Sequence, residues 1–246
     1  FSFENFWCQN ADGKQAMAAT AEVKKYVGQP MERVEDETLL MGQAQYSDHL
    51  PTRAGTLHAA ILRSPHAHAE ILSIDTSESE KTSGVVAVMT GEDIREMSEA
   101  FLIVLRQPIN QWALAVKKVR YVGESVALVV ARDRYLAEDA VSKIMVEYIT
   151  LQPVIDQEQS VKDGAPLVHE GVGSNVVSTR EFTYGDPDSA FAEADKKIEI
   201  TVRYPRNSQT PIEGFVVTAD YHPGEDLYDV ASNYQGPFTS HPVMSM

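Results

Sequence analysis

The chain has 246 residues, of which 43% are hydrophobic and 23% charged, a composition typical of a folded globular protein rather than a disordered or collagen-like one. Lysine and arginine number 21 against 36 aspartates and glutamates, so the formal net charge is −15. Such a surface repels phosphate backbones and anionic lipids, and the longest apolar runs are too short to span a bilayer. We therefore expect no nucleic-acid partner and no membrane.

Cys8 is the only cysteine of the sequence, which excludes an internal disulfide and any cysteine-ligated zinc or iron–sulfur site within it. It lies in a polar stretch with no histidine nearby, so we do not expect a catalytic thiol. The N-terminal residues lack the basic stretch and apolar core of a secretory signal. Because a lone thiol fits a reducing compartment, we expect a cytoplasmic protein.

The first half of the chain predicts short strands and helices in a mixed order. Residues 1–26 carry no clear strand signal and are interpreted as an extension. Thr90 precedes two acidic residues, which is typical of a helix N-terminus and predicts a helix over 92–100. Apolar or alternating stretches predict strands over 57–63, 69–74 and 85–89.

The middle of the chain has the clearest pattern. Gly123 stands at a turn before the apolar run 125–131, and we expect it to be structural, with a left-handed backbone or a close approach that excludes a side chain. Asp133 is placed to cap a helix over 134–145, whose apolar positions recur at three- and four-residue steps. A strand over 146–148 completes a strand–helix–strand unit.

Residues 152–164 resemble a linker, and the remaining sequence predicts a second unit. It has a short helix over 186–194 that begins at Asp186 and Pro187, and strands over 175–183, 197–204, 215–221 and 227–231. Strands and helices without a regular βαβ rhythm indicate an α+β fold. The sequence ends soon after the last strand, so we expect the second unit to be incomplete.

His66 and His68 are two positions apart and would share one face of a strand, as in His-x-His metal sites. A metal would need further ligands, and Glu70 is the only nearby acid on that face. We therefore favour a pair of hydrogen-bonding histidines near a strand start and expect no metal site in this chain. The sequence also contains no Gly-x-Ser-x-Gly elbow and no glycine-rich phosphate loop.

Two polar residues flank the last apolar strands. Glu213 lies between a turn and the strand at 215–221, where a buried carboxylate must find a hydrogen-bond or cation partner. Gln235 closes the run 229–234 and precedes Gly236 and Pro237. Its amide can donate to one group and accept from another, which suits a cofactor oxygen. By pattern alone, both residues are more often structural than functional.

Several segments, taken together and in order, resemble the molybdenum-binding large subunit of the xanthine dehydrogenase, aldehyde oxidase and aerobic carbon monoxide dehydrogenase family. The likeness runs from about Val27 to Gln235. It includes the ordered segments GQP and RVED (28–36), GQAQY (42–46), LHAAILRSPHAHA (57–69), GVVAV (84–88), KVRYVGESVA (118–127), AEDA (137–140), VEY (146–148), PIEG (211–214) and YQGP (234–237).

This resemblance implies an α+β chain with an α/β hammerhead domain over 27–152, after an extension over 1–26. Residues 153–246 would then be the beginning of a molybdopterin-binding domain. It also implies that Gln235 lies beside the oxo ligand of the molybdenum, with its amide donating to that oxygen and its carbonyl held by a backbone N–H. Asn233-Tyr234 stands where the family more often has Ser-Thr. No metal role is implied for His66 or His68.

The resemblance further implies oxidative hydroxylation of an aldehyde, an N-heterocycle or a similar small molecule, with water as the oxygen source. The family's glycine-rich pterin segment and its catalytic glutamate have no counterpart here, so we expect no activity from this chain alone and no catalytic residue confirmed within it. The molybdenum–molybdopterin cofactor would be shared with a second chain or a missing C-terminal part. FAD and [2Fe-2S] clusters would lie on other subunits, because one cysteine cannot hold a cluster.

Two alternatives remain open at this point. The chain could be a non-catalytic scaffold or assembly module of such a complex, in which Gln235 has no chemical role. It could also be a free-standing metal-binding protein that uses His66 and His68, which metal analysis of the isolated chain would reveal.

Overall fold

The structure is a computed structural model that describes residues 26–101, 109–205, 207–208 and 210–244. The chain divides into two units, residues 1–46 and 47–246. The predicted extension at 1–25 and the residue Cys8 lie outside the described residues. Within its described residues, 26–46, the first unit contains one short helix, α1 (Asp36–Leu40), none of whose residues is buried.

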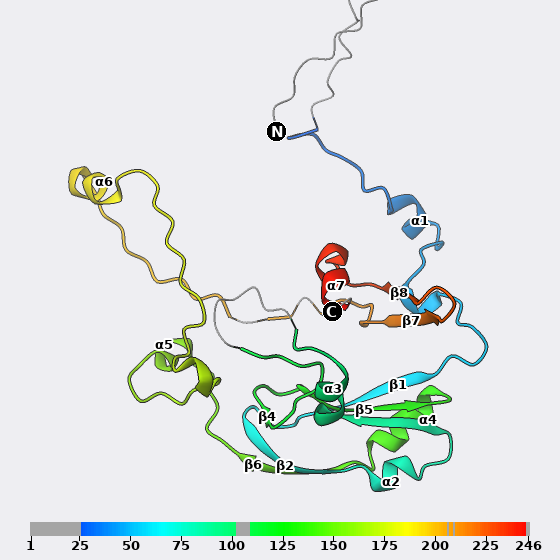
Figure 1. Cartoon of the computed structure of the whole chain (residues 1–246). Helices are drawn as coiled ribbons and strands as arrows, with labels where there is room; N and C mark the ends of the chain where they lie inside the picture. Colours follow the sequence, from blue (N-terminus) through cyan, green and yellow to red (C-terminus); the bar gives the residue numbers. More distant parts are fainter. Residues whose placement is uncertain (1–25, 102–108, 206, 209, 245–246) are drawn as a thin grey trace, which may run out of the picture. The chain divides into compact units, whose positions relative to one another are not determined.

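The second unit begins with a 3₁₀ turn, η1 (Ser47–His49), and a three-stranded antiparallel sheet (Figure 1). Its strands are β1 (His58–Arg63), β3 (Val85–Thr90) and β5 (Ser125–Ala131), with β5 in the centre. The apolar run at 125–131 becomes this central strand because it can be covered on both faces. Val126, Ala127, Val129 and Ala131 are fully buried there.

A second antiparallel sheet has the order β4-β2-β6. It is formed by β2 (Ala69–Asp75), the two-residue β4 (Lys118–Val119) and β6 (Met145–Thr150). Alternate residues of β5 face two small cores. Val126 packs with Ala69 and Val119, next to the second sheet, whereas Ala127 and Val129 pack with residues that include Ala140 of the helix α4.

Helix α4 (Arg134–Val141) packs against β1 and β5 and is capped as predicted. The Asp133 carboxylate accepts a hydrogen bond from the Leu136 N–H at 2.9 Å. The helix ends four residues before the predicted boundary, because Met145 is already paired with Asp75 in the second sheet. The predicted strand–helix–strand unit is therefore present as β5, α4 and β6, but its two strands belong to different sheets.

The remaining short helices of this region are α2 (Ser77–Glu80) and α3 (Gly91–Met97). Thr90 begins α3 with a capping box, in which its N–H and hydroxyl both donate to the Asp93 carboxylate at 2.7 Å. The helix ends before the predicted residue 100. At Ser98 the backbone is extended and the hydroxyl donates to the Ile94 carbonyl at 2.8 Å.

Gly123 has a φ of +90°, which confirms the left-handed backbone expected at this turn. A Cβ at this position would meet no atom within 4 Å, so the backbone angle and not a close approach is the reason for glycine. The turn is anchored to the end of β1, because the Gly123 N–H donates to the Ser64 carbonyl at 2.8 Å and the Ser64 N–H donates to the Glu124 carbonyl at 2.8 Å.

Beyond residue 152 the chain has little regular structure until its last part. It contains α5 (Gln157–Ser160), η2 (Glu170–Val172) and α6 (Pro187–Glu193). Helix α6 begins at the predicted place, and Asp186 caps it. The strands predicted over 175–183 and 197–204 were wrong: no strand is formed by these residues where the structure describes them. Ile198, Ile200 and Val202 are each more than three-quarters exposed, so the alternating pattern has no partner strand in the described chain.

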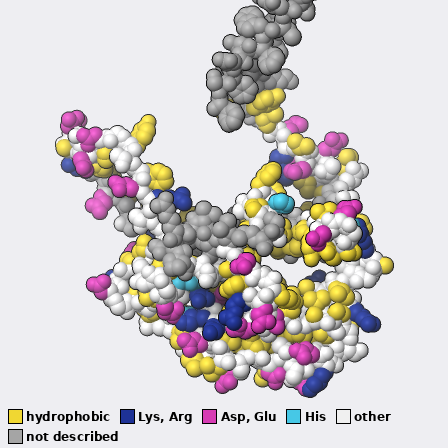
Figure 2. Space-filling view, viewed as in Figure 1, with side chains coloured by type: hydrophobic (Ala, Val, Ile, Leu, Met, Phe, Trp, Pro, Cys, Tyr) yellow, Lys and Arg dark blue, Asp and Glu magenta, His cyan; other side chains and the backbone are white. Residues whose placement is uncertain are grey.

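The last part is a hairpin of β7 (Val217–His222) and β8 (Leu227–Ser232), followed by α7 (Pro237–Met244). The two strands pair in register from Val217 with Ser232 to His222 with Leu227. Every residue of β8 is exposed, and hydrophobic side chains are gathered on the surface over this hairpin (Figure 2). No helix in the described parts of the chain has the length and apolar character needed to cross a membrane.

Candidate functional site

Gln235 lies in the loop between β8 and α7, which we call the glutamine loop and define as residues Asn233–Pro237. Its side chain is exposed. It forms no hydrogen bond with any residue that the structure describes. The amide therefore presents both its donor and its acceptor to whatever adjoins this face of the chain. The backbone N–H expected to hold the Gln235 carbonyl is not found among the described residues.

The backbone of the glutamine loop is held by Asn233. The Asn233 amide donates to the Gly214 carbonyl at 2.8 Å, and its oxygen accepts from the Val216 N–H at 3.2 Å. One side chain thereby ties the end of β8 to the residues that lead into β7. This role suits asparagine, because its side chain carries one acceptor and two donors at short reach.

Two further contacts order the loop on either side of Gln235. The Tyr234 ring packs edge-on against Phe215, with 6.4 Å between the ring centroids. The Gly236 carbonyl accepts from the Thr239 and Ser240 N–H groups at 3.0 and 2.9 Å, which begins α7. The backbone on both sides of Gln235 is thus fixed while the side chain itself has no partner among the described residues.

Glu213 is half-buried beside the same loop, and its carboxylate finds a backbone partner far away in sequence. The Ser47 N–H donates to Glu213 Oε1 at 2.8 Å. This bond is the largest influence on the pKa of Glu213, which lies below its ordinary value although partial desolvation acts in the opposite direction. From the sequence, a hydrogen-bond or cation partner is expected for this carboxylate, and the structure provides a hydrogen-bond donor, the Ser47 N–H.

His66 and His68 each contact other residues of the protein. The His66 ring packs edge-on against Tyr148, with 4.9 Å between the ring centroids, and the buried His68 ring has its Nδ1 2.9 Å from the Gln152 carbonyl oxygen. Among the residues described, no group of three or more histidine, cysteine, aspartate and glutamate residues is arranged to hold a metal ion.

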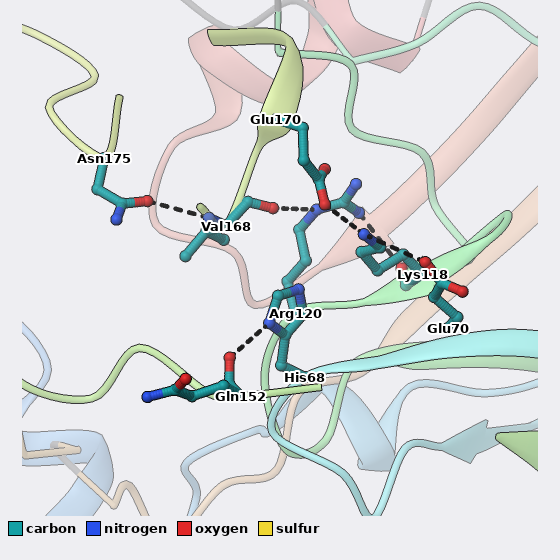
Figure 3. A network of polar contacts seen from close by, with 8 residues as sticks. All are labelled: His68, Glu70, Lys118, Arg120, Gln152, Val168, Glu170 and Asn175. Atoms are coloured by element: carbon teal, nitrogen blue, oxygen red, sulfur yellow. Dashed lines mark hydrogen bonds and ion pairs between the residues drawn. The ribbon is translucent and has the colours of Figure 1, made fainter. Parts of the chain in front are cut away.

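Sequence reasoning missed a cluster of polar residues between β4 and the segment 168–175 (Figure 3). Lys118, whose side chain is 14% exposed, forms ion pairs with Glu170 and with Glu70 of β2. Arg120 donates from Nε to the Val168 carbonyl at 3.2 Å. Asn175 accepts from the Val168 N–H at 3.0 Å. Figure 2 shows basic side chains beside acidic ones over β4, where this cluster reaches the surface.

The charges of this cluster indicate a structural role. The pKa of Glu170 is lowered, chiefly by its hydrogen bond with Lys118, whereas burial and the nearby Arg120 guanidinium lower the pKa of His169. Glu124 accepts from the Arg120 N–H, yet burial raises the pKa of its carboxyl. Lys118 and Arg120 both bond to protein groups of the segment 168–175, so the cluster connects β4 to that segment.

The comparison with protein families gives two matches that follow the order of the fold. Residues 41–152 match the aldehyde oxidase and xanthine dehydrogenase a/b hammerhead domain. Residues 168–246, which include the β7–β8 hairpin and the glutamine loop, match the molybdopterin cofactor-binding domain.

The chain is also similar to parts of much longer curated relatives. The chain is 36% identical over 223 residues to the 6-hydroxypseudooxynicotine dehydrogenase complex subunit gamma of Paenarthrobacter nicotinovorans, covering 87% of this chain and 28% of that protein. It is 29% identical over 242 residues to the carbon monoxide dehydrogenase large chain of Afipia carboxidovorans, covering 93% of this chain and 30% of that protein. The chain thus spans less than a third of the length of these relatives.

Solved structures agree with these matches. Quinoline 2-oxidoreductase from Pseudomonas putida 86 aligns with a TM-score of 0.74 at 33% identity, over 86% of this chain and 27% of that one. A Cu,Mo-CO dehydrogenase aligns with a TM-score of 0.73 at 29% identity, over 89% of this chain and 29% of that one.

The fold is thus an α+β arrangement of the kind found in molybdenum-enzyme large subunits, with the hammerhead region first and the molybdopterin-binding region second. The chain belongs to the xanthine dehydrogenase and aldehyde oxidase family, as the sequence resemblance predicted.

Proposed function

We propose that this chain supplies part of the molybdenum–molybdopterin site of a hydroxylase that oxidises an aldehyde, an N-heterocycle or a similar small molecule with water as the oxygen source. The observation that carries the proposal is the exposed Gln235 amide on an otherwise fixed loop, within the region that matches a molybdopterin-binding domain. The relatives named above are a subunit of a 6-hydroxypseudooxynicotine dehydrogenase complex and a carbon monoxide dehydrogenase large chain, which supports an oxidoreductase component.

One side chain of this sequence, that of Gln235, is suited to contact this cofactor. When bound, the molybdenum centre supplies the two-electron oxidation and the activated oxygen that no protein side chain can provide. Gln235 would contribute a neutral amide that donates a hydrogen bond to the cofactor without exchanging a proton. Asn233 keeps the backbone of the loop in place, so this donor is positioned before the substrate arrives.

The remaining parts of the site lie outside this sequence in our proposal. A chain spanning less than a third of its relatives carries one edge of the cofactor site, and a second chain or a further C-terminal part completes it. An iron–sulfur subunit and an FAD subunit would carry the electrons away, since the residues of this sequence, with one cysteine, cannot themselves ligate a cluster. The relatives include a subunit of a dehydrogenase complex, which supports such partners.

We expect the 246-residue chain expressed alone to be poorly behaved and to contain no molybdenum. The β7–β8 hairpin and α7 leave large apolar side chains uncovered, with Tyr228 of β8 63% and Phe238 of α7 95% exposed. One amide donor is also far too little to retain a cofactor. Molybdenum analysis and pterin fluorescence, measured on the isolated chain and on the assembled enzyme, test this expectation. Stoichiometric molybdopterin on the isolated chain would contradict the shared site.

A further inference from the structure

The segment that leads into β1 is bonded to the β7–β8 hairpin at two points. We call residues 47–57 the lead-in segment. At its start, the Ser47 N–H donates to Glu213 at 2.8 Å, and further along, Arg53 forms an ion pair with Asp220 of β7. Residues 166 positions apart in the sequence therefore meet, and Figure 1 shows the lead-in segment beside β7 and β8.

The two anchors differ in their relation to the glutamine loop. Glu213 directly precedes Gly214, whose carbonyl accepts from Asn233, and Asn233 is two residues before Gln235. Asp220 lies in the middle of the hairpin, opposite Asp229 of β8. Glu213 is thus connected to the glutamine loop through Gly214 and the Asn233 side chain, whereas Asp220 is paired across the hairpin.

Glu213 makes its bond as a carboxylate. The Ser47 N–H, and to a smaller extent the side chains of Asn233 and Ser47 and the nearby His49, hold its pKa below the ordinary value. The bond to Ser47 is therefore charge-assisted at neutral pH, and such bonds are about twice as strong as those between neutral groups.

We propose that Glu213 is a positioning residue, which fixes the backbone that presents the Gln235 amide by anchoring Gly214 and Asn233 to the lead-in segment. This inference rests on the proposed role of Gln235. In this proposal Glu213 does not contact the cofactor. Its carboxylate accepts the hydrogen bond from the Ser47 N–H, and the side chain beside it is that of Asn233. Its effect on the reaction passes through the position of Gln235.

A double-mutant cycle on the assembled enzyme tests this proposal. A misplacement of about 1 Å can lower a rate by up to roughly 100-fold, so we expect Glu213→Ala to lower kcat per molybdenum atom by about 10-fold with little change in KM. In a Gln235→Ala background the same change should lower kcat less than about twofold, because there is no amide left to position. Glu213→Gln keeps an acceptor oxygen for the Ser47 N–H and should lower kcat no more than about threefold.

The control is Asp220→Asn, which removes the other anchor of the lead-in segment and should leave kcat per molybdenum unchanged. Full additivity of Glu213→Ala and Gln235→Ala, or an unchanged kcat in Glu213→Ala, would overturn the positioning role alone. A silent Gln235→Ala would overturn the proposed function and this inference together. If Glu213→Ala does not assemble, the cycle is run with Glu213→Gln, whose smaller loss of kcat should likewise disappear in the Gln235→Ala background.

Discussion

Replacing Gln235 by alanine should lower the turnover of the assembled enzyme by roughly 100- to 1,000-fold, since one preorganised donor to a developing charge is worth about 2.7–4 kcal/mol. Folding and molybdenum content should stay nearly unchanged. The Gln235 side chain is exposed and forms no hydrogen bond with the described residues, so its loss removes no hydrogen bond of the described fold. Steady-state kinetics and molybdenum analysis on the same preparation measure both quantities.

Gln159→Ala is the matched control for this change. Gln159 is also an exposed glutamine, but it lies in α5, far from the glutamine loop in sequence. We expect its removal to leave turnover and metal content at the parental values. Near-normal turnover of Gln235→Ala at full metal loading would instead favour the scaffold interpretation, in which Gln235 only ends a strand.

Replacing Gly91 by alanine should destabilise the protein by about 3 kcal/mol or more, at the upper end of the cost of overpacking. A Cβ at this buried position would lie 2.1 Å from the Ala115 carbonyl oxygen and 2.6 Å from its carbon. The Ala115 backbone cannot easily shift away from the added Cβ. Its N–H donates to the Ser125 carbonyl at 2.8 Å, and Ala115 belongs to the hydrophobic core. Urea unfolding of the assembled protein measures the loss.

Gly171→Ala provides the comparison for the Gly91 variant. Gly171 lies in η2 without a left-handed backbone angle, and a Cβ there would meet no atom within 4 Å, so alanine fits. We expect its unfolding midpoint to stay near that of the parent. A Gly91→Ala protein that unfolds within about 0.5 kcal/mol of the parent would show that the chain at residue 115 moves aside at little cost.

The hammerhead region could largely be predicted from the sequence, because its local signals agree with its packing. The run 125–131 is apolar on both faces and becomes the buried central strand. Asp133 and Thr90 begin helices by capping, which depends on neighbours three residues away. The ends of α3 and α4 could not be predicted as well, because they are decided by a serine hydroxyl bond and by pairing with a distant strand.

The second region was predicted less well for a related reason. The alternation at 197–204 predicts one face of a strand, but a strand also needs a partner, and none is formed within the described residues. Long-range polar contacts are equally invisible in a single sequence. Nothing near Glu213 indicates that its partner is the N–H of Ser47, and nothing near Lys118 indicates Glu170.

Gln235 could be identified as a candidate from its sequence context and from the family resemblance. The hydrogen bonds of Asn233 that hold the glutamine loop could not be predicted in this way. Asn233 stands where the family more often has another residue, and the sequence does not indicate which groups its amide bonds. The structure shows what the asparagine does, since it bonds both Gly214 and Val216.

The most direct test of the account is a structure of the assembled enzyme with its cofactor bound. Because hydrogen bonds of this kind are about 3 Å long, we expect Gln235 Nε2 at about that distance from an oxygen on the molybdenum, with Asn233 still bonded to Gly214. A Gln235 side chain that faces solvent, with another chain supplying every contact to the cofactor, would contradict the claim that this protein forms part of the site.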